Sequence, residues 1–401
     1  MESEPGREDT EELATWHTSL RAEFPIITRH TGMTYLDSAA TAQKPQAVLD
    51  AVQEYLTTSN ANAGRGTYPW ANRTTALLHE TRNRVKAFLD DPSPDTSGVH
   101  FTSGTTEGLR LVASDWLVHQ LRDGDEIIVP AADHQANISP WHEAVELLAR
   151  QGTRISVRSM PYQLSSGDYD TDALAGLVSS RTRFVAATHV HHVYGGDMNV
   201  HRIRRTVGPD VTICLDAAQS IGHLPVSVQA MDVDFVAFSG HKALALPGSG
   251  AIWSRNARGA PFSPRGWSGT PNTVGVVSLN AALEWLERAG LERVEKWTVR
   301  LAARLTDGLR ALAPYEVLGC QQSLAADSLV QQRHGIVTFR HSAIDSVDLG
   351  FILFSHGFMV RTDGLCQGSA GERRSSVRVS LHVYNSPGEV DRLLDVLADL
   401  A

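Results

Sequence analysis

The sequence predicts an α/β protein in which a large domain, built on a mostly parallel sheet, is followed by a smaller α+β domain. Two observations predict this fold class. From residue 99 to residue 239, short apolar segments rich in β-branched residues alternate with amphipathic segments of helical spacing, as in parallel sheets covered by helices. After about residue 275, long helical segments are followed by several strand-like segments, which indicates a second architecture.

The length of the chain also favours two domains, because 401 residues exceed what one hydrophobic core usually supports. We expect an acidic, amphipathic N-terminal arm over residues 1–30, a large domain over residues 31–285 and a small C-terminal domain over residues 286–401. The sequence contains no internal repeat and no low-complexity segment.

The large domain is predicted to open with one short strand and two helices. Residues 33–40 (MTYLDSAA) predict a short strand that runs into a turn of small residues. Residues 44–58 have helical apolar spacing, with Pro45 near the start, where proline is tolerated. Residues 74–90 predict a second amphipathic helix.

The alternating region supplies the strands of the sheet. Apolar, β-branched segments predict strands at 99–103, 125–130, 154–161, 182–190, 210–216 and 233–239. Amphipathic segments predict helices at 105–121 and 137–152. In the small domain, residues 278–312 predict one or two long helices. Further segments there predict three strands and a closing helix, at 334–340, 358–363, 376–384 and 388–400.

The composition excludes several classes of protein. The net charge of −9 makes a nucleic-acid partner unexpected, and no apolar run is long enough to span a membrane. The polar, acidic N-terminus lacks the pattern of a secretory signal, so we expect a cytoplasmic protein. Three widely spaced cysteines and the absence of metal-binding spacings predict neither disulfides nor a metal site, although THVHH (188–192) gathers histidines.

Residues with chemical potential follow the carboxyl ends of the predicted strands, where parallel sheets bind their ligands. Thr105 and Thr106 open a helix after the strand at 99–103, and helix starts with flanking hydroxyls bind anions. The others are His134, Asp216, Gln219, Ser239, His241 and Lys242. Taken singly, each is more often a helix cap or a structural polar group.

Together these residues match the needs of pyridoxal phosphate. The lysine can form a Schiff base with the cofactor, and a carboxylate can hold a proton on the pyridine nitrogen. An aromatic side chain can stack on the ring, and the hydroxyls and the helix start can hold the phosphate. This combination answers why Lys242 stands at the end of a buried, apolar strand.

Seven segments of the sequence carry a family resemblance. They are YLDSAATAQKP (35–45), FTSGTTEGLRLVA (101–113), DHQANISPW (133–141), the stretch 215–242, GTPNT (269–273), VRTDGLC (360–366) and VRVSLHVYNSPGEVDRL (377–393). From about residue 25 to its end, the chain resembles the class V aminotransferase family of fold-type I pyridoxal phosphate enzymes. It is most similar to the group II cysteine desulfurases, also called selenocysteine lyases. The resemblance implies that the predicted sheet has seven strands.

The resemblance also implies roles in binding the cofactor. Lys242 would carry the Schiff base and move protons at the substrate α-carbon, while Asp216 would pair with the pyridinium nitrogen. His134 would stack on the ring, and Gln219 and His192 would contact the phenolic oxygen. The phosphate would be held by Thr105, Thr106, Ser239 and His241. Thr270 would reach the cofactor of a partner subunit, which implies a homodimer.

Further implied roles concern the substrate, a small amino acid. Arg378 would bind the substrate carboxylate, for which a guanidinium fork is suited, and Arg361, His192 and Ala39 would line the substrate pocket. Cys366 falls where the desulfurases keep the nucleophile that takes sulfur from cysteine as a persulfide. A sulfur-acceptor protein is then an implied partner.

Four departures from the desulfurase pattern concern the substrate side of the site. Leu365 precedes Cys366 where histidine is common, His192 replaces asparagine, and Gly64 stands where histidine is common. The segment between residues 254 and 269 is also shorter than in the desulfurases. The sequence therefore leaves two reactions open. One is cysteine desulfuration, and the other is a C–S lyase, aminotransferase or epimerase reaction on a different amino acid. A scaffold protein without activity is disfavoured because the cofactor residues are all present.

Overall fold

The computed structural model of the chain describes most of the sequence, with side chains from residue 11 onward. The described residues are 5–64, 66–163, 168–256, 261–264, 269–319, 333–362 and 376–401. No helix in these ranges is both long enough and apolar enough to cross a membrane.

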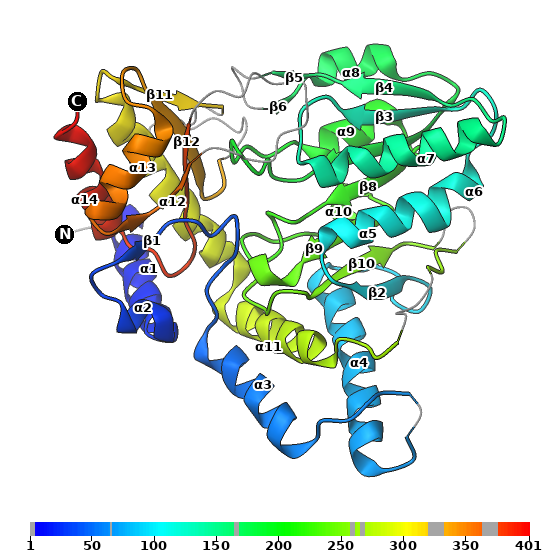
Figure 1. Ribbon diagram of the computed structural model, residues 1–401, viewed down its shortest axis with the longest axis horizontal. Coiled ribbons are helices and arrows are strands. Elements are labelled where there is room, and N and C mark those ends of the chain that lie inside the picture. The colour runs from blue at the N-terminus through cyan, green and yellow to red at the C-terminus, as the bar shows by residue number, and fades with distance from the viewer. Residues whose placement is uncertain are drawn as a thin grey trace.

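A seven-stranded sheet forms the centre of the larger part (Figure 1). Its strands, in spatial order, are β2 (Gly98–Thr102), β10 (Gly250–Ser254), β9 (Phe235–Ser239), β8 (Thr212–Asp216), β7 (Thr182–Thr188), β3 (Glu126–Pro130) and β4 (Ser156–Met160). The strands from β9 to β4 pair in parallel, whereas β10 is antiparallel to both of its neighbours. The prediction of a mostly parallel, seven-stranded sheet is confirmed, although the strand pattern had not identified β10.

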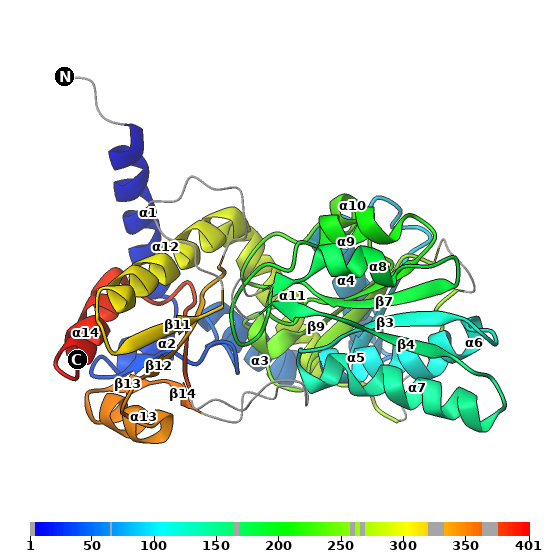
Figure 2. The ribbon, with the colours of Figure 1, turned by 90° about the horizontal axis from the view of Figure 1, so that it is seen from above.

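Helices cover both faces of this sheet, as Figure 2 shows from above. On one face, α5 (Thr105–Val112) and α7 (Ser139–Arg150) pack on alternate strand residues such as Phe184 and Ala186. On the other face, Val185 and Ala187 belong to a core shared with α4 (Pro69–Phe88), α9 (Val200–Val207) and α11 (Thr273–Ala289). The one-in-two alternation explains why these strands are apolar throughout, since both faces are buried.

Several predicted helices differ in detail from the structure. The segment at 105–121 begins as α5 but passes through a π-helical turn at Ala113–Leu117 before α6 (Val118–Gln120). The segment at 278–312 is two helices, α11 and α12 (Leu291–Arg310). Gly290 separates them with a φ of +83°, a conformation that glycine adopts without strain. The helix predicted at 44–58 is α3 (Gln46–Thr58).

The second sheet is antiparallel and lies at the other end of the molecule (Figure 1). Its order is β11 (Tyr315–Leu318), β12 (Ile336–His341), β15 (Val377–Ser380) and β14 (Arg361–Thr362). It shares a core with α12, α13 (Ser346–Ser355) and α14 (Pro387–Ala398). The helix predicted at 388–400 is α14, which begins with a capping box between Ser386 and Glu389.

The N-terminal segment contributes to the same core. Leu13 of α1 (Pro5–Arg21) and Leu36 belong to it, and β1 (Thr34–Tyr35) pairs in parallel with β13 (Phe358–Met359). The chain therefore enters the small sheet region before it builds the large sheet. The domain boundaries at residues 30 and 285 stay predictions.

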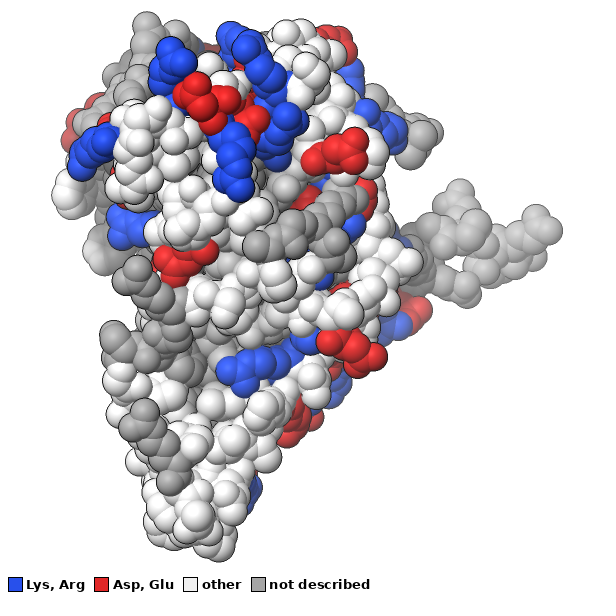
Figure 3. Space-filling model, turned by 90° about the vertical axis from the view of Figure 1, so that its right-hand side faces the viewer, with Lys and Arg blue, Asp and Glu red and all other residues white. Residues whose placement is uncertain are grey.

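Basic and acidic side chains lie interleaved on the side of the molecule shown in Figure 3. At the amino ends of β3, β4 and β7, Glu126 is buried and forms ion pairs with Arg158 and Arg181 at 3.3 and 3.2 Å. Arg183 pairs with Asp125 nearby at 3.1 Å. The basic residues at this end of the sheet are therefore partly neutralised by acidic neighbours.

Candidate active site

A cavity of about 260 Å³ lies at the carboxyl ends of the central strands, on the side that faces the small sheet. Twelve of the predicted site residues line this cavity. They are Ala39, Thr105, Thr106, His134, His192, Asp216, Gln219, Ser239, His241, Lys242, Arg361 and Arg378. The residues from Thr105 to Lys242 follow the ends of strands in the large sheet, as expected for a parallel sheet, whereas Arg361 and Arg378 come from β14 and β15 of the small sheet.

Two predicted residues are not among those that line the cavity. Thr270 is described, and it is exposed outside the cavity. Cys366 lies outside the described residues, so its position relative to Lys242 stays a prediction. Cys214 is buried in β8, as its apolar surroundings predict.

Lys242 and Asp216 reach the cavity from neighbouring strands. Lys242 ends a short 3₁₀ turn (Gly240–Lys242) after β9, and Asp216 is the last residue of β8. One Asp216 oxygen accepts a hydrogen bond from the backbone N–H of Ala218 at 2.9 Å. Burial raises the pKa of Asp216, while the bond from Ala218 and the charge of Lys242 oppose that shift. The cavity therefore contains a buried carboxylate that a cation would stabilise in its charged form.

The start of α5 is fixed against the end of β9. The Ser239 hydroxyl accepts a hydrogen bond from the Thr105 backbone N–H at 2.9 Å and lies 2.8 Å from the Thr105 hydroxyl. A side chain at Gly250 would meet the Cα atom of Gly104 at 2.7 Å, so this close approach requires glycine. The result is a helix N-terminus with hydroxyl groups at the cavity wall, which suits a phosphate group.

His134 presents a neutral ring to the cavity. Its Nδ1 atom accepts a hydrogen bond from the backbone N–H of Ala136 at 3.1 Å, which leaves the ring proton on Nε2. Burial, followed by the charges of Lys242 and Arg378, lowers its pKa to about 4. The ring is uncharged at neutral pH, so it can pack against an aromatic ligand without the cost of burying a cation.

Two arginines share one carboxylate at the side of the cavity nearest the small sheet. Arg378 and Arg361 face each other across β15 and β14, and Asp37 lies 2.9 Å from the first and 3.8 Å from the second. Arg378 also donates to the backbone carbonyl of His192 at 2.9 Å. Arg378 is buried, and its guanidinium is held in place on two sides, as a receptor for a substrate carboxylate requires.

Among the further residues that line the cavity, two have polar side chains that sequence reasoning had not identified. Asp133 immediately precedes His134, and Thr188 ends β7. Both lie at or just after the end of a predicted strand, as Asp216 does. The same position in the sequence could therefore have identified them. Gln219 reaches the cavity as predicted, and its side-chain amide also donates to the backbone carbonyl of Ala39 at 3.0 Å.

The groups in the cavity fit pyridoxal phosphate. The cofactor carries an aldehyde, a basic ring nitrogen, an aromatic face and a phosphate. The cavity offers, respectively, the Lys242 amine, the buried Asp216 carboxylate, the neutral His134 ring and the start of α5. Each chemical feature of the cofactor has a complementary group, and the substrate side has the two arginines.

Comparisons with known proteins agree with this assignment. The family model for class V aminotransferases matches residues 34–393. The cysteine desulfurase of Cronobacter sakazakii is 32% identical over 406 residues, covering 94% of this chain and 96% of that protein. Cysteine desulfurase CsdA of Escherichia coli K12 is 31% identical over 404 residues, with the same two coverages.

Solved structures show the same fold. An apo cysteine desulfurase from Thermococcus onnurineus NA1 superimposes with a TM-score of 0.82 at 26% identity, covering 96% of this chain and 97% of that one. The S-sulfonic acid form of Escherichia coli CsdA gives a TM-score of 0.79 at 29% identity, covering 96% and 98%. Because the family model and relatives above 30% identity extend over nearly the whole chain, the protein belongs to the class V aminotransferase family of pyridoxal-phosphate-dependent enzymes.

Proposed function

We propose that this enzyme is a cysteine desulfurase, which removes sulfur from L-cysteine, or selenium from selenocysteine, and leaves alanine. The observation that carries the proposal is the convergence of Lys242, Asp216 and the Arg378–Asp37–Arg361 group on one cavity. These groups suit a small amino acid whose carboxylate is held beside a reactive lysine. The relatives named cysteine desulfurase support this choice of reaction.

The cofactor residues divide into four sets. We propose that the phosphate is held by the start of α5, with Thr105 and Thr106, and by Ser239 and His241. The pyridine nitrogen is assigned to Asp216, the ring face to His134, and the phenolic oxygen to Gln219 and His192. When bound, pyridoxal phosphate supplies an electron-withdrawing ring that stabilises negative charge at the substrate α-carbon.

The chain's own residues then handle the substrate and its protons. Lys242 carries the cofactor, accepts the proton from the substrate α-carbon and returns a proton during the reaction. Arg378 binds the substrate carboxylate, and Asp37 keeps its guanidinium oriented. Arg361 and Ala39 complete the wall of the substrate pocket.

Sulfur transfer is assigned to Cys366. Its thiolate attacks the substrate sulfur, the bond between sulfur and the β-carbon breaks, and the β-carbon takes a proton to give alanine. Cys366 is left as a persulfide, and no external oxidant or reductant is consumed in this step. A sulfur-acceptor protein would then remove the sulfur. The homodimer implied by Thr270 and the cytoplasmic location stay predictions.

The test is to incubate the cofactor-loaded enzyme with L-cysteine and a thiol reductant, and to quantify alanine and sulfide together. We expect equal amounts of the two products, and we expect Cys366→Ala to abolish both. Cys320→Ala is the matched control, since it removes a cysteine that lies in no motif, and it should retain turnover. Full turnover by Cys366→Ala would refute the proposed role of the thiol.

A second candidate is a C–S lyase, aminotransferase or epimerase reaction on a different amino acid. The observation that favours it is the buried imidazole of His192 in the cavity wall, next to the arginine assigned to the substrate carboxylate. If cysteine changes the cofactor spectrum but yields no alanine, this candidate replaces the first. Larger amino acids would then be tested as substrates.

A further inference from the structure

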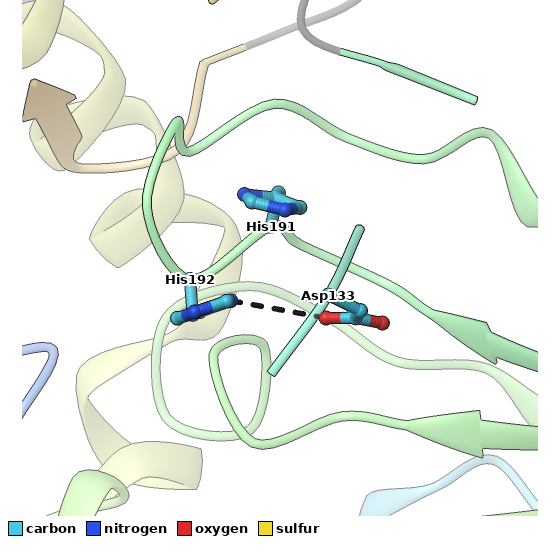
Figure 4. Close-up of side chains that lie close together, drawn as sticks. All are labelled: Asp133, His191 and His192. Carbon is cyan, nitrogen blue, oxygen red and sulfur yellow. Dashed lines mark ion pairs between the residues drawn. The ribbon is translucent and has the colours of Figure 1, made fainter. Parts of the chain in front are cut away.

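The cavity wall contains a buried acid–imidazole pair that the proposed reaction does not use. The His192 Nδ1 atom lies 3.8 Å from Oδ1 of Asp133, and both side chains are buried. Figure 4 shows a nitrogen of the His192 ring directed at this carboxylate. Both residues line the cavity, so the pair lies between the ligand space and the protein interior.

Asp133 is held in place by its own hydrogen bonds. Its Oδ1 atom accepts from the backbone N–H of His134 at 2.6 Å. Its Oδ2 atom accepts from the side-chain amide of Asn137 at 2.9 Å and from the Tyr169 hydroxyl at 3.1 Å. Burial, followed by the charge of Asp216, nevertheless raises the pKa of Asp133 to about 7. This carboxylate can therefore take up a proton close to neutral pH.

His192 is in the opposite situation. Burial lowers its pKa well below the ordinary value, and the neighbouring groups deepen that shift. The groups that lower it, after burial, are His191, His134, Arg378 and Lys242. The imidazole is therefore poor at holding a positive charge, although it can exchange one proton for another and remain neutral.

The same atoms do not suit a metal ion. Asp133, His191 and His192 place ligand atoms within 4.8 Å of one another. Nitrogens on one tetrahedral zinc are about 3.4 Å apart, from bond lengths near 2.1 Å. In addition, Nδ1 of His191 accepts hydrogen bonds from the backbone N–H groups of Val193 and Tyr194, and its ring also contacts the Ala132 carbonyl. His191 is thus held by backbone contacts and does not serve as a metal ligand. Only Asp133 and His192 remain of the three groups.

We propose that His192 and Asp133 form a proton relay for the group bound in the cavity. His192 accepts a proton from that group at Nε2 and passes the proton on Nδ1 to Asp133. The carboxylate becomes a carboxylic acid, the imidazole remains neutral in its other tautomer, and no electron is transferred. The reverse sequence returns the proton to the ligand.

The geometry requires one small movement. The distance of 3.8 Å exceeds an N–H···O hydrogen bond by about 0.9 Å. The backbone of His192 is anchored, because its carbonyl accepts from Arg378, so the ring moves by side-chain rotation. Catalytic hydrogen bonds are commonly long before ligands bind and tighten afterwards. Because Arg378 donates to the His192 carbonyl, substrate binding at Arg378 would directly affect the position of His192.

The inference rests on the proposed use of pyridoxal phosphate, although it does not require cysteine to be the substrate. It is tested by following the visible absorption of the cofactor-loaded enzyme through a pH titration, without substrate. We expect an inflection near pH 7, where Asp133 titrates. His192→Asn and Asp133→Asn should each remove this inflection or move it by about one pH unit or more, a tenfold change in proton affinity.

The double variant separates a relay from two independent groups. If the pair acts as one unit, His192→Asn combined with Asp133→Asn should match either single variant. His189→Gln is the matched control, because this buried ring neither lines the cavity nor belongs to the groups that shift the pKa of His192 or Asp133, and it should keep the inflection. If Asp133→Asn does not fold, the relay is tested by the pH inflection in His192→Asn and His192→Gln, which change the residue of the pair that accepts the proton from the ligand.

Two results would overturn the relay. One is an inflection that persists unchanged in His192→Asn, since Asp133 would then act without the imidazole. The other is additive shifts in the double variant. An enzyme that yields no alanine from cysteine but keeps the inflection would refute the desulfurase proposal and leave the relay standing. An enzyme that yields alanine from cysteine but lacks the inflection would refute the relay and leave the desulfurase proposal standing.

Discussion

His223 offers a direct test of how burial governs the stability of this protein. Its ring is buried in the turn after β8, with its centroid 4.2 Å from that of His382. Burial, followed by the charges of His334 and Lys242, lowers its pKa from 6.5 to about 3. The folded protein therefore keeps this ring neutral under conditions in which the unfolded chain takes up a proton.

The sign and size of the effect follow from this difference. Below about pH 6.5 the unfolded state binds one more proton than the folded state, so stability falls as the pH falls, until about pH 3. Between about pH 7.5 and about pH 5, protonation of one such histidine in the unfolded chain removes about 2 kcal/mol. Replacing His223 with glutamine should remove that share of the pH dependence, because the amide does not titrate.

The assay is urea unfolding at both pH values and at a fixed protein concentration, followed by circular dichroism. The loss of unfolding free energy between the two pH values should be about 2 kcal/mol smaller in His223→Gln than in the parent protein. His142→Gln, on the exposed surface of α7, is the matched control and should lose as much as the parent. Equal losses in His223→Gln and the parent would refute the reasoning.

Three further predictions concern the site and its supports. Asp37→Ala removes the carboxylate that orients Arg378, and steady-state kinetics should show KM for the amino acid raised roughly tenfold, since about 1.5 kcal/mol of charge-assisted hydrogen bonding is lost. An unchanged KM would contradict this role. Ser239→Ala should weaken cofactor binding roughly tenfold in a fluorescence titration, because the hydroxyl that fixes the start of α5 is lost. Gly195→Ala should cost about 2 kcal/mol or more in urea unfolding, because its φ is +70° and the new Cβ atom would lie 2.4 Å from the Ile336 carbonyl oxygen; a neutral result would exclude the clash.

The positions of Asp216 and Lys242 were predictable because they depend on local order in the sequence. Each follows a run of apolar, β-branched residues, and the carboxyl ends of parallel strands share one edge of the sheet. β10 was not predicted, since it follows β9 without an intervening long helix and its antiparallel direction breaks the alternation of strands and helices. The hydrophobic pattern of the sequence does not reveal that an antiparallel strand inserts between β2 and β9.

The contacts among the residues assigned to the substrate could not be predicted, because they depend on the three-dimensional fold and not on local sequence order. Arg378 and Arg361 were identified by resemblance, but their shared contact with Asp37 depends on the register of β14 and β15 and on a residue 341 positions away. Asp133 was not predicted, although it lies directly before His134 at the same edge of the sheet. Its burial, which gives it proton chemistry, arises only when Tyr169 and Asn137 close over it.

The insertion of β10 has a consequence for how the chain is made. β2 has β10 as its only strand neighbour in the described part, and their register partners are up to about 150 residues apart. On a ribosome that adds about 5–20 residues per second, β10 is synthesised about 8–30 s after β2. During that interval β2 exposes a β-branched edge that can pair with other chains. Nascent chains that stop before residue 250 should therefore aggregate or engage chaperones, whereas slightly longer ones should close the sheet.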